Sequence, residues 1–186
     1  MQVAATLQCG GNRRGGMNSV AKTSGTAWGC GAISTAQWTG VSVRDVLTAA
    51  GLKDPDAAGV AHVSFHAADD MCASVPVEKV FNPYGDVLLA WDMNGAPIPA
   101  DHGAPLRAVV PGHVGVRNVK WVTRLEAGAQ EAEGMWQRGT TPRPSACTCV
   151  RVWCVYACAQ PLSCAEGHVR QRGGLASLPS SLECEW

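Results

Sequence analysis

TLQCGGNRR, residues 6–14, is a short apolar run that ends on a cysteine, two glycines, an asparagine and two arginines. Residues 3–7 are apolar and β-branched enough to form a strand, and the glycine pair at 10–11 breaks it. We therefore expect Cys9 to lie at the end of a strand, where its thiol can face a pocket.

The chemistry of this stretch indicates a metal beside an anion pocket. A thiolate is a soft metal ligand, and Arg13 and Arg14 place two permanent cations within five residues of Cys9. Guanidinium groups present planar forks of N–H donors that match a small oxyanion. A buried structural cysteine followed by a glycine turn and solvated arginines remains the alternative, because free cysteine is among the most buried residue types.

Blocks farther along the chain favour the metal interpretation, because together with the first one they resemble the molybdopterin domain of sulfite oxidases. The six blocks, in the same order as in that family, are residues 7–14, 31–38, 87–95, 101–107, 109–112 and 118–121. The resemblance covers about residues 3–138 and implies an α+β fold with a mixed sheet, incomplete at the N-terminus. Plant and algal nitrate reductases share this domain, but block 31–38 is more similar to the sulfite oxidase version.

The resemblance assigns the substrate side of the site to three residues. Cys9 matches the only protein ligand to molybdenum, and Arg14, the second arginine of the pair, matches a residue that binds the substrate anion. Trp28 matches a tryptophan that walls the substrate pocket. Without the motif, Trp28 would fit core packing equally well.

The resemblance also implies a set of contacts to the pyranopterin. An aspartate after the strand at 61–65 helps to hold the pterin, and Asp69 is the match, although Asp70 or a merely solvated loop carboxylate fits the sequence too. His102 and Arg107 match residues that bind the pterin phosphate. The later contacts are Asn118, Val119 and Lys120.

Local patterns predict the elements around these residues. Ser42 and Asp45 form a capping-box pattern that begins a short amphipathic helix ending at Gly51. Cys30 and Cys72 lack metal-ligand spacing with Cys9, so we expect buried free thiols. The remaining elements are strands at 1–7, 61–65 and 86–91, a loop at 9–18, a helix at 76–81, a turn at 94–95, a strand, glycine turn and strand across 109–125, and a loop at 126–134.

Composition limits the class of protein. The chain has 186 residues, 46% of them hydrophobic and 16% charged, with a formal net charge of zero, as expected for a globular domain. A basic stripe and an apolar run of about 20 residues are both absent, so we expect neither nucleic acid nor membrane as a partner. No haem is expected, because the His-Pro-Gly-Gly motif of a cytochrome b5 domain is missing.

A composition shift divides the chain into a partial molybdopterin domain at 1–138 and an unrelated segment at 139–186. Three of the nine cysteines precede the boundary and six lie between 147 and 184. Trp136-Gln137-Arg138 matches a family motif that continues into an essential tyrosine, whereas Gly139 and its successors do not. A zinc or disulfide module, a disordered natural tail and a translated intron or shifted frame are the alternatives, and the abrupt break favours the last.

The implied function is sulfite oxidase-like oxygen-atom transfer, which converts sulfite to sulfate on a molybdenum–molybdopterin cofactor and passes electrons to cytochrome c or oxygen. A nitrate reductase domain and a truncated, non-catalytic fragment that cannot hold the cofactor are the alternatives. The family forms homodimers through a further domain that this sequence lacks. No targeting signal is visible, so a mitochondrial or peroxisomal location rests on the resemblance alone.

Overall fold

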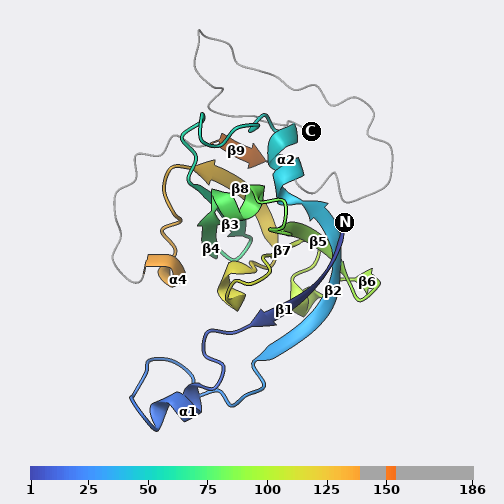
Figure 1. Ribbon diagram of the computed structural model, residues 1–186. Helices are drawn as coiled ribbons and strands as arrows, with labels where there is room; N and C mark the ends of the chain where they lie inside the picture. Colours follow the sequence, from blue (N-terminus) through green and yellow to red (C-terminus); the bar gives the residue numbers. More distant parts are fainter. Residues whose placement is uncertain (139–149, 154–186) are drawn as a thin grey trace.

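The computed structural model describes residues 1–138 and 150–153 as two packed antiparallel sheets with short helices at their margins (Figure 1). This is an α+β architecture, as the sequence predicts, and all strand pairs among the described residues are antiparallel, whereas the family resemblance implies a mixed sheet. Among the described residues, no helix is long and apolar enough to cross a membrane.

The first sheet carries the start of the chain. It has the order β1-β2-β5-β6, and β7 also pairs with β5. The β1–β2 register runs from Gln2↔Thr39 to Gln8↔Ile33, so Cys9 follows directly at the end of the ladder, as predicted. The strands are β1 (Gln2–Gln8), β2 (Ile33–Ser42), β5 (Leu88–Met93), β6 (Ala96–Pro97) and β7 (Arg107–Val109).

The second sheet has the order β4-β3-β8-β9. Alternate residues of β3 and β8 face the core, and Val63, Phe65 and Leu125 are fully buried. The strands are β3 (His62–Ala67), β4 (Cys72–Pro76), β8 (Val122–Gly128) and β9 (Val150–Trp153). Strand β9 falls within the segment predicted to be unrelated, and the rest of 139–186 lies outside the described residues.

The buried hydrophobic residues form two clusters, and strand β5 contributes to both. Leu89 packs in the main cluster between the sheets, whereas Leu88 and Ala90 pack in a smaller cluster around Trp38. All three β5 residues are fully buried, which confirms that this continuous apolar run is covered on both faces. At the following turn, Asn94 and Gly95 both adopt positive φ, the geometry of the tight hairpin turn predicted there.

The helices are short. Helix α2 begins after Ser42, whose Oγ accepts a hydrogen bond from the Asp45 amide at 3.4 Å, and it buries Val43 and Leu47. The other α-helices are α1 (Arg14–Asn18), α3 (Val77–Phe81) and α4 (Met135–Arg138), and α2 itself spans Val43–Ala49.

Three local predictions need correction. Residues 114–116 are not extended: most of this segment forms the 3₁₀ helix η2 (Gly115–Arg117), held by bonds from Arg117 N to Val114 O and from Asn118 N to Gly115 O. The predicted loop at 9–18 contains α1, and β8 continues through Gly128 into the predicted loop at 126–134.

Candidate functional site

Cys9 presents an exposed thiol where β1 ends. Its amide donates to Ala32 O at 3.0 Å, and the chain then turns, with Asn12 N bonded to Cys9 O at 3.0 Å. The sulfur accepts a contact from Gly11 N at 3.4 Å. This exposure argues against the alternative of a buried structural cysteine.

Arg14 and Trp28 meet at Gly11, two residues after Cys9. An ideal Cβ placed on Gly11 would lie 2.8 Å from Arg14 Nη1 and 2.9 Å from Trp28 Cδ1, so a side chain at residue 11 would have to displace one of the two. Arg14 Nη1 is held by Thr26 O at 3.1 Å, and Gly15 N bonds to Trp28 O at 3.0 Å. The structure therefore brings together the three residues predicted for the substrate side.

The Cys9 turn packs against η2. A Cβ on Gly10 would lie 3.1 Å from Val114 Cγ2, and one on Gly115 would lie 3.7 Å from Cys9 Cα. Gly115 also lines a pocket of about 150 Å³. The pocket is lined by Asp69, Met71, Gly115, Val116, Asn118, Val119, Lys120 and Trp121, which include four of the six predicted cofactor contacts.

Lys120 connects this pocket to the segment that contains His102. Its Nζ donates to Asp101 O at 2.9 Å and lies 4.1 Å from the centre of the Trp121 ring. The predicted contact His102 is exposed and ends the 3₁₀ helix η1 (Ala100–His102). The next residue, Gly103, has φ of 109°, and a Cβ there would lie 2.8 Å from Lys120 Cβ. His102 is thus placed at the edge of the pocket.

Arg107 links the backbone at His102 to the backbone at the pocket residue Asn118. Its side chain is buried, with Nη1 donating to His102 O at 2.6 Å and Nη2 donating to Asn118 O at 3.1 Å. The guanidinium lies 4.8 Å from the centre of the Trp38 ring. Burial lowers the pKa of Arg107 to about 10, so the group stays charged at neutral pH.

Asn118 and Val119 line the pocket, but their side chains have internal partners. Asn118 Oδ1 accepts from Val110 N at 2.6 Å, and Nδ2 donates to His113 O and Val114 O. Val119 belongs to the main core cluster. Both residues shape the pocket wall through the backbone that they fix.

Asp69 lies in the loop after β3, as predicted. It is exposed, and its Oδ1 accepts from Met71 N at 3.2 Å, which leaves its second carboxylate oxygen outside that turn. Asp70, the alternative, has φ of 62° and does not belong to the residues that line the pocket. The structure therefore favours Asp69 as the pocket residue.

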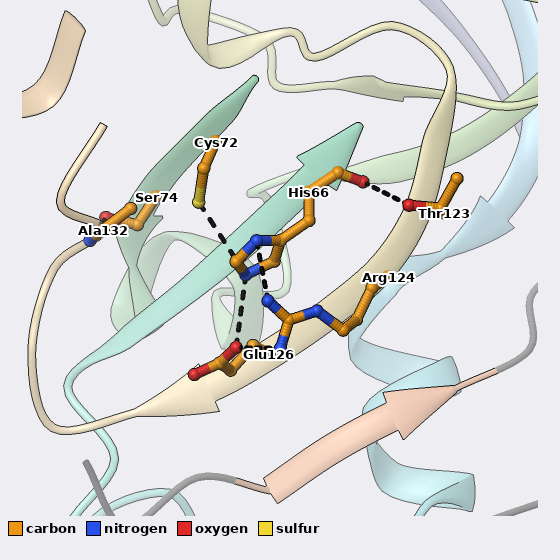
Figure 2. A network of polar contacts seen from close by, with 7 residues as sticks. All are labelled: His66, Cys72, Ser74, Thr123, Arg124, Glu126 and Ala132. Atoms are coloured by element: carbon orange, nitrogen blue, oxygen red, sulfur yellow. Dashed lines mark hydrogen bonds and ion pairs between the residues drawn. The ribbon is translucent and has the colours of Figure 1, made fainter. Parts of the chain in front are cut away.

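A second polar cluster, shown in Figure 2, was not predicted from the sequence. His66 Nδ1 accepts from Arg124 Nη2 at 2.9 Å, so Nε2 carries the proton and donates to Glu126, 3.2 Å away. Arg124 Nη1 also donates to the same Glu126 oxygen. His66 and Arg124 face each other across the β3–β8 ladder, a pairing that depends on register and leaves no local signal.

Cys72 lies against this cluster, with its sulfur 3.7 Å from His66 Nε2. Burial, and then the Glu126 carboxylate, raise the pKa of the Cys72 thiol to about 11. Cys72 is half-buried, which is close to the prediction, whereas Cys30 is exposed and the prediction of a buried thiol there is wrong. In residues 1–138 and 150–153, no three His, Cys, Asp or Glu side chains gather as a metal site.

Comparison with models of known protein families identifies the family of this chain. Residues 1–136 match the model of the oxidoreductase molybdopterin binding domain. The chain belongs to this family. The resemblance inferred from the six sequence blocks is thereby confirmed.

The relatives of this molybdopterin-domain chain are much longer than the chain itself. Rat mitochondrial sulfite oxidase is 46% identical over 145 residues, covering 74% of the chain and 26% of the relative. Sulfite oxidase of Arabidopsis thaliana is 40% identical, covering 73% and 37% respectively. Nitrate reductase [NAD(P)H] of Hordeum vulgare is 40% identical, covering 73% and 16%.

Among solved structures, the sulfane dehydrogenase SoxCD from Paracoccus pantotrophus is similar, with a TM-score of 0.62 and 31% sequence identity. The match covers 75% of this chain and 34% of that one. The fold of the family is therefore present in this chain.

The residues present fit the cofactor that the family name implies. Cys9 offers an exposed sulfur, and the adjoining pocket offers the Lys120 ammonium and the Asp69 carboxylate. Arg107 Nε is a buried N–H group with no hydrogen-bond partner among the described residues, and it lies on the side chain that supports His102. Lys120 is the cationic donor that lines the pocket, and its ammonium suits the phosphate of a pterin.

Proposed function

We propose that this chain binds a molybdenum pyranopterin through the Cys9 sulfur and takes part in the oxidation of sulfite to sulfate. The observation that supports this most directly is the meeting of Cys9, Arg14 and Trp28 at Gly11, beside the pocket that contains Lys120. When bound, the cofactor supplies the oxygen-atom transfer and the redox chemistry. The chain supplies a ligand, orientation and charge.

Arg14 binds the substrate anion. Sulfite must leave water to react, and a guanidinium beside Cys9 offsets the cost of removing its hydration shell. The bond from Arg14 Nη1 to Thr26 O orients the guanidinium, and Gly25 leaves room for it, since a Cβ there would lie 2.3 Å from Nη1. Trp28, which is 47% exposed, covers one side of the anion and excludes water from it.

Lys120, Asp69 and His102 bind the pterin and its phosphate. Lys120 uses one of its three N–H donors on Asp101 O and directs the others toward an anionic group. Arg107 acts as a positioning residue, because its two Nη groups hold the backbone of His102 and Asn118 on both sides of the site. Asn118 and Val119 fix the pocket wall.

Nitrate reduction on the same cofactor is the second candidate, supported by the 40% identity to the barley nitrate reductase. Electron transfer to cytochrome c or oxygen, a homodimeric assembly and a mitochondrial or peroxisomal location follow from the sulfite oxidase resemblance in the same way. The third candidate is a fragment that has kept the fold and lost the cofactor.

The deciding experiment measures molybdenum per chain after expression in a host that makes the cofactor. We expect metal in the parent chain and in Cys72→Ser, because Cys72 lies in the other polar cluster, and loss of metal in Cys9→Ser. Sulfite-dependent reduction of ferricyanide exceeding viologen-driven nitrate consumption would then favour sulfite as the substrate.

Absence of molybdenum from parent and variants alike would reject cofactor binding and leave the fragment interpretation. Metal that persists in Cys9→Ser would reject Cys9 as the ligand. Circular dichroism of each variant shows whether the fold is retained, so that lost metal is not confused with lost structure.

A further inference from the structure

Strand β1 forms one edge of the first sheet, and among the described strands and helices only β2 runs alongside it. The β1–β2 register continues without a shift from Gln2↔Thr39 to Gln8↔Ile33, so β1 contains no bulge. Residues 2–8 include no charged side chain and no proline. Edge strands are commonly protected by such features, because their unpaired backbone groups can bind another strand. Strand β1 is therefore an open edge.

Strand β4, an edge of the second sheet, is covered by contrast. Gln137 Oε1 accepts a hydrogen bond from Ser74 N at 3.2 Å, and Ser74 Oγ accepts one from Ala132 N at 2.9 Å. The segment that leads into α4 thus satisfies polar groups at this edge. Within residues 1–138 and 150–153, the backbone of β1 makes hydrogen bonds to β2 alone.

Alternate residues of β1 direct their backbone N–H and C=O groups away from β2. Met1 N donates to Gly40 O, and Gly40 N donates to Met1 O at 3.0 Å, so these two residues form a hydrogen-bonded pair. Such pairs recur at every second residue of an antiparallel ladder, so the odd-numbered residues of β1 bond to β2. The even-numbered residues direct their backbone groups toward the open edge. These are Gln2, Ala4, Thr6 and Gln8.

The sequence of β1 is nearly symmetric about Ala5. Read outward from Ala5 in either direction, QVAATLQ gives a short side chain, a branched aliphatic side chain and a glutamine. A two-fold axis at Ala5 therefore matches like residues of two antiparallel copies. It also places each even-numbered residue opposite an even-numbered residue, so that the outward N–H and C=O groups of the two copies meet. Like charges do not oppose each other, because the strand carries none.

The apolar side chains of β1 fit the same arrangement. Val3 and Leu7 are half-buried and pack against the smaller core cluster around Trp38. Across the two-fold axis, Val3 of one copy lies opposite Leu7 of the other at a non-hydrogen-bonded position, where paired side chains are closest. Burial of their remaining apolar surface then adds to the backbone hydrogen bonds.

We propose that β1 is a docking edge for a second copy of this chain, which adds its own β1 antiparallel across a two-fold axis at Ala5. The five-stranded first sheet then continues into that of the second copy. The interface is isologous, because the same residues serve on both sides. Pairing needs no metal or cofactor, so it is independent of the proposed function, and it differs from the family's dimerisation through a further domain.

Helix η2 limits the length of the paired segment. A Cβ on Gly115 would lie 3.2 Å from Gln8 O, so η2 approaches the last residue of β1. The inner hydrogen bonds, between Ala4 of each copy and Thr6 of the other, therefore hold the pair together. One short strand buries less surface than the roughly 800 Å² per partner of a stable complex, so we expect a weak dimer.

The test measures the mass of the full 186-residue chain by sedimentation equilibrium, with dithiothreitol present to exclude intermolecular disulfides. We expect the mass to rise with concentration from 19.4 kDa toward twice that value. Ala4→Pro removes an N–H that the β1–β2 ladder does not use. It should weaken the dimer at least about tenfold, because two intermolecular bonds are lost by symmetry. Ala4→Ser is the control, which keeps the N–H and should associate like the parent chain.

Amide exchange followed by NMR gives a readout on the parent chain itself. The Ala4 and Thr6 amides should exchange more slowly as the concentration rises, whereas β2 should protect the Val3 and Ala5 amides at every concentration. A mass of 19.4 kDa at all concentrations would overturn the proposal, as would an Ala4→Pro chain that is folded by circular dichroism and dimerises like the parent. Protection of Ala4 and Thr6 that is independent of concentration would also overturn it, because the edge would then be covered within one chain.

Discussion

Asn118 uses its whole amide to fix the wall of the pocket. It is 3% exposed, its oxygen accepts from the Val110 amide, and its nitrogen donates to the carbonyls of His113 and Val114. Two segments that flank the glycine turn at 112 are thereby held by one side chain. This structural role stands beside the cofactor contact that the family resemblance implies for Asn118.

Replacing this side chain should cost stability. In Asn118→Ala the Val110 N–H and the His113 C=O lose their partner, whereas Val114 O keeps its bond from Arg117 N. At about 1–3 kcal/mol for each unsatisfied buried group, partly recovered by relaxation, we expect a loss of about 3 kcal/mol. Urea unfolding measures it. Asn82→Ala is the control, because exposed Asn82 makes one local bond to the Tyr84 amide. Equal losses in the two variants would contradict the role assigned to Asn118.

At this scale the sequence predicts identities better than roles. The family resemblance indicates that Cys9, Arg14 and Trp28 form the substrate side. Their meeting at Gly11 depends on the return of the chain along residues 25–29, which the resemblance alone does not show. Arg107 shows the limit clearly. Whether a guanidinium faces a ligand or its own backbone is decided by tertiary neighbours, here the carbonyls of His102 and Asn118.

Among the elements, β2 is the one whose shape the site depends on most. Its pairing with β5 shifts register between Thr39 and Gly40, and this bulge brings the Gly40 backbone against Leu89. The irregularity lets β2 pair with β1 at one end, which carries Cys9, and with the buried part of β5 at the other.

A methyl group at the bulge should disrupt this arrangement. A Cβ on Gly40 would lie 2.0 Å from Leu89 O, so Gly40→Ala must separate the two strands, at a cost of about 3 kcal/mol for overpacking. The free energy of unfolding in urea measures the effect. Gly29→Ala, where a Cβ has open space, should change stability little. A wild-type stability for Gly40→Ala would show that the strand pair adjusts freely.

The elements that the sequence predicts well are those with strong local signals. The buried strand β5, the Asn94-Gly95 turn and the Ser42 cap follow from an apolar run, a turn dipeptide and a capping residue. The helix η2 was missed because valines at 114 and 116 favour a strand locally, whereas bonds from Arg117 N and Asn118 N close a tight helical turn. Strand β9 was missed because its pairing with β8 is a distant contact.

For the molecule as a whole, the site is a junction between the two sheets. Cys9 follows β1 and Arg107 lies on β7 in the first sheet, whereas Asp69 follows β3 and Lys120 precedes β8 in the second (Figure 1). The two sheets are held against each other by the main core cluster, which contains Leu89, Phe65 and Leu125. The integrity of the site therefore follows the global stability of the fold.

The free energy of unfolding should be greatest at pH values between the titration of His113 and the titration of Cys72. Burial, aided by the positive charges of Lys79 and Arg117, lowers the pKa of His113 from 6.5. Below pH 6.5 the unfolded chain gains a proton that the folded chain resists, so stability falls as the pH falls. The pKa of Cys72 rises from 9.0 to about 11, so above pH 9.0 the unfolded chain loses a proton that the folded chain keeps, and stability falls as the pH rises.

Urea midpoints measured across this range should therefore form a plateau between about pH 6.5 and pH 9. His113→Gln should reduce the slope on the acid side only, and Cys72→Ala should reduce it on the alkaline side only, because each removes one of the two linked protons. Each variant is thus the control for the other. Curves for both variants that run parallel to the wild type would show that neither group governs the pH dependence, and that other titrating groups set the acid and alkaline limits of the fold.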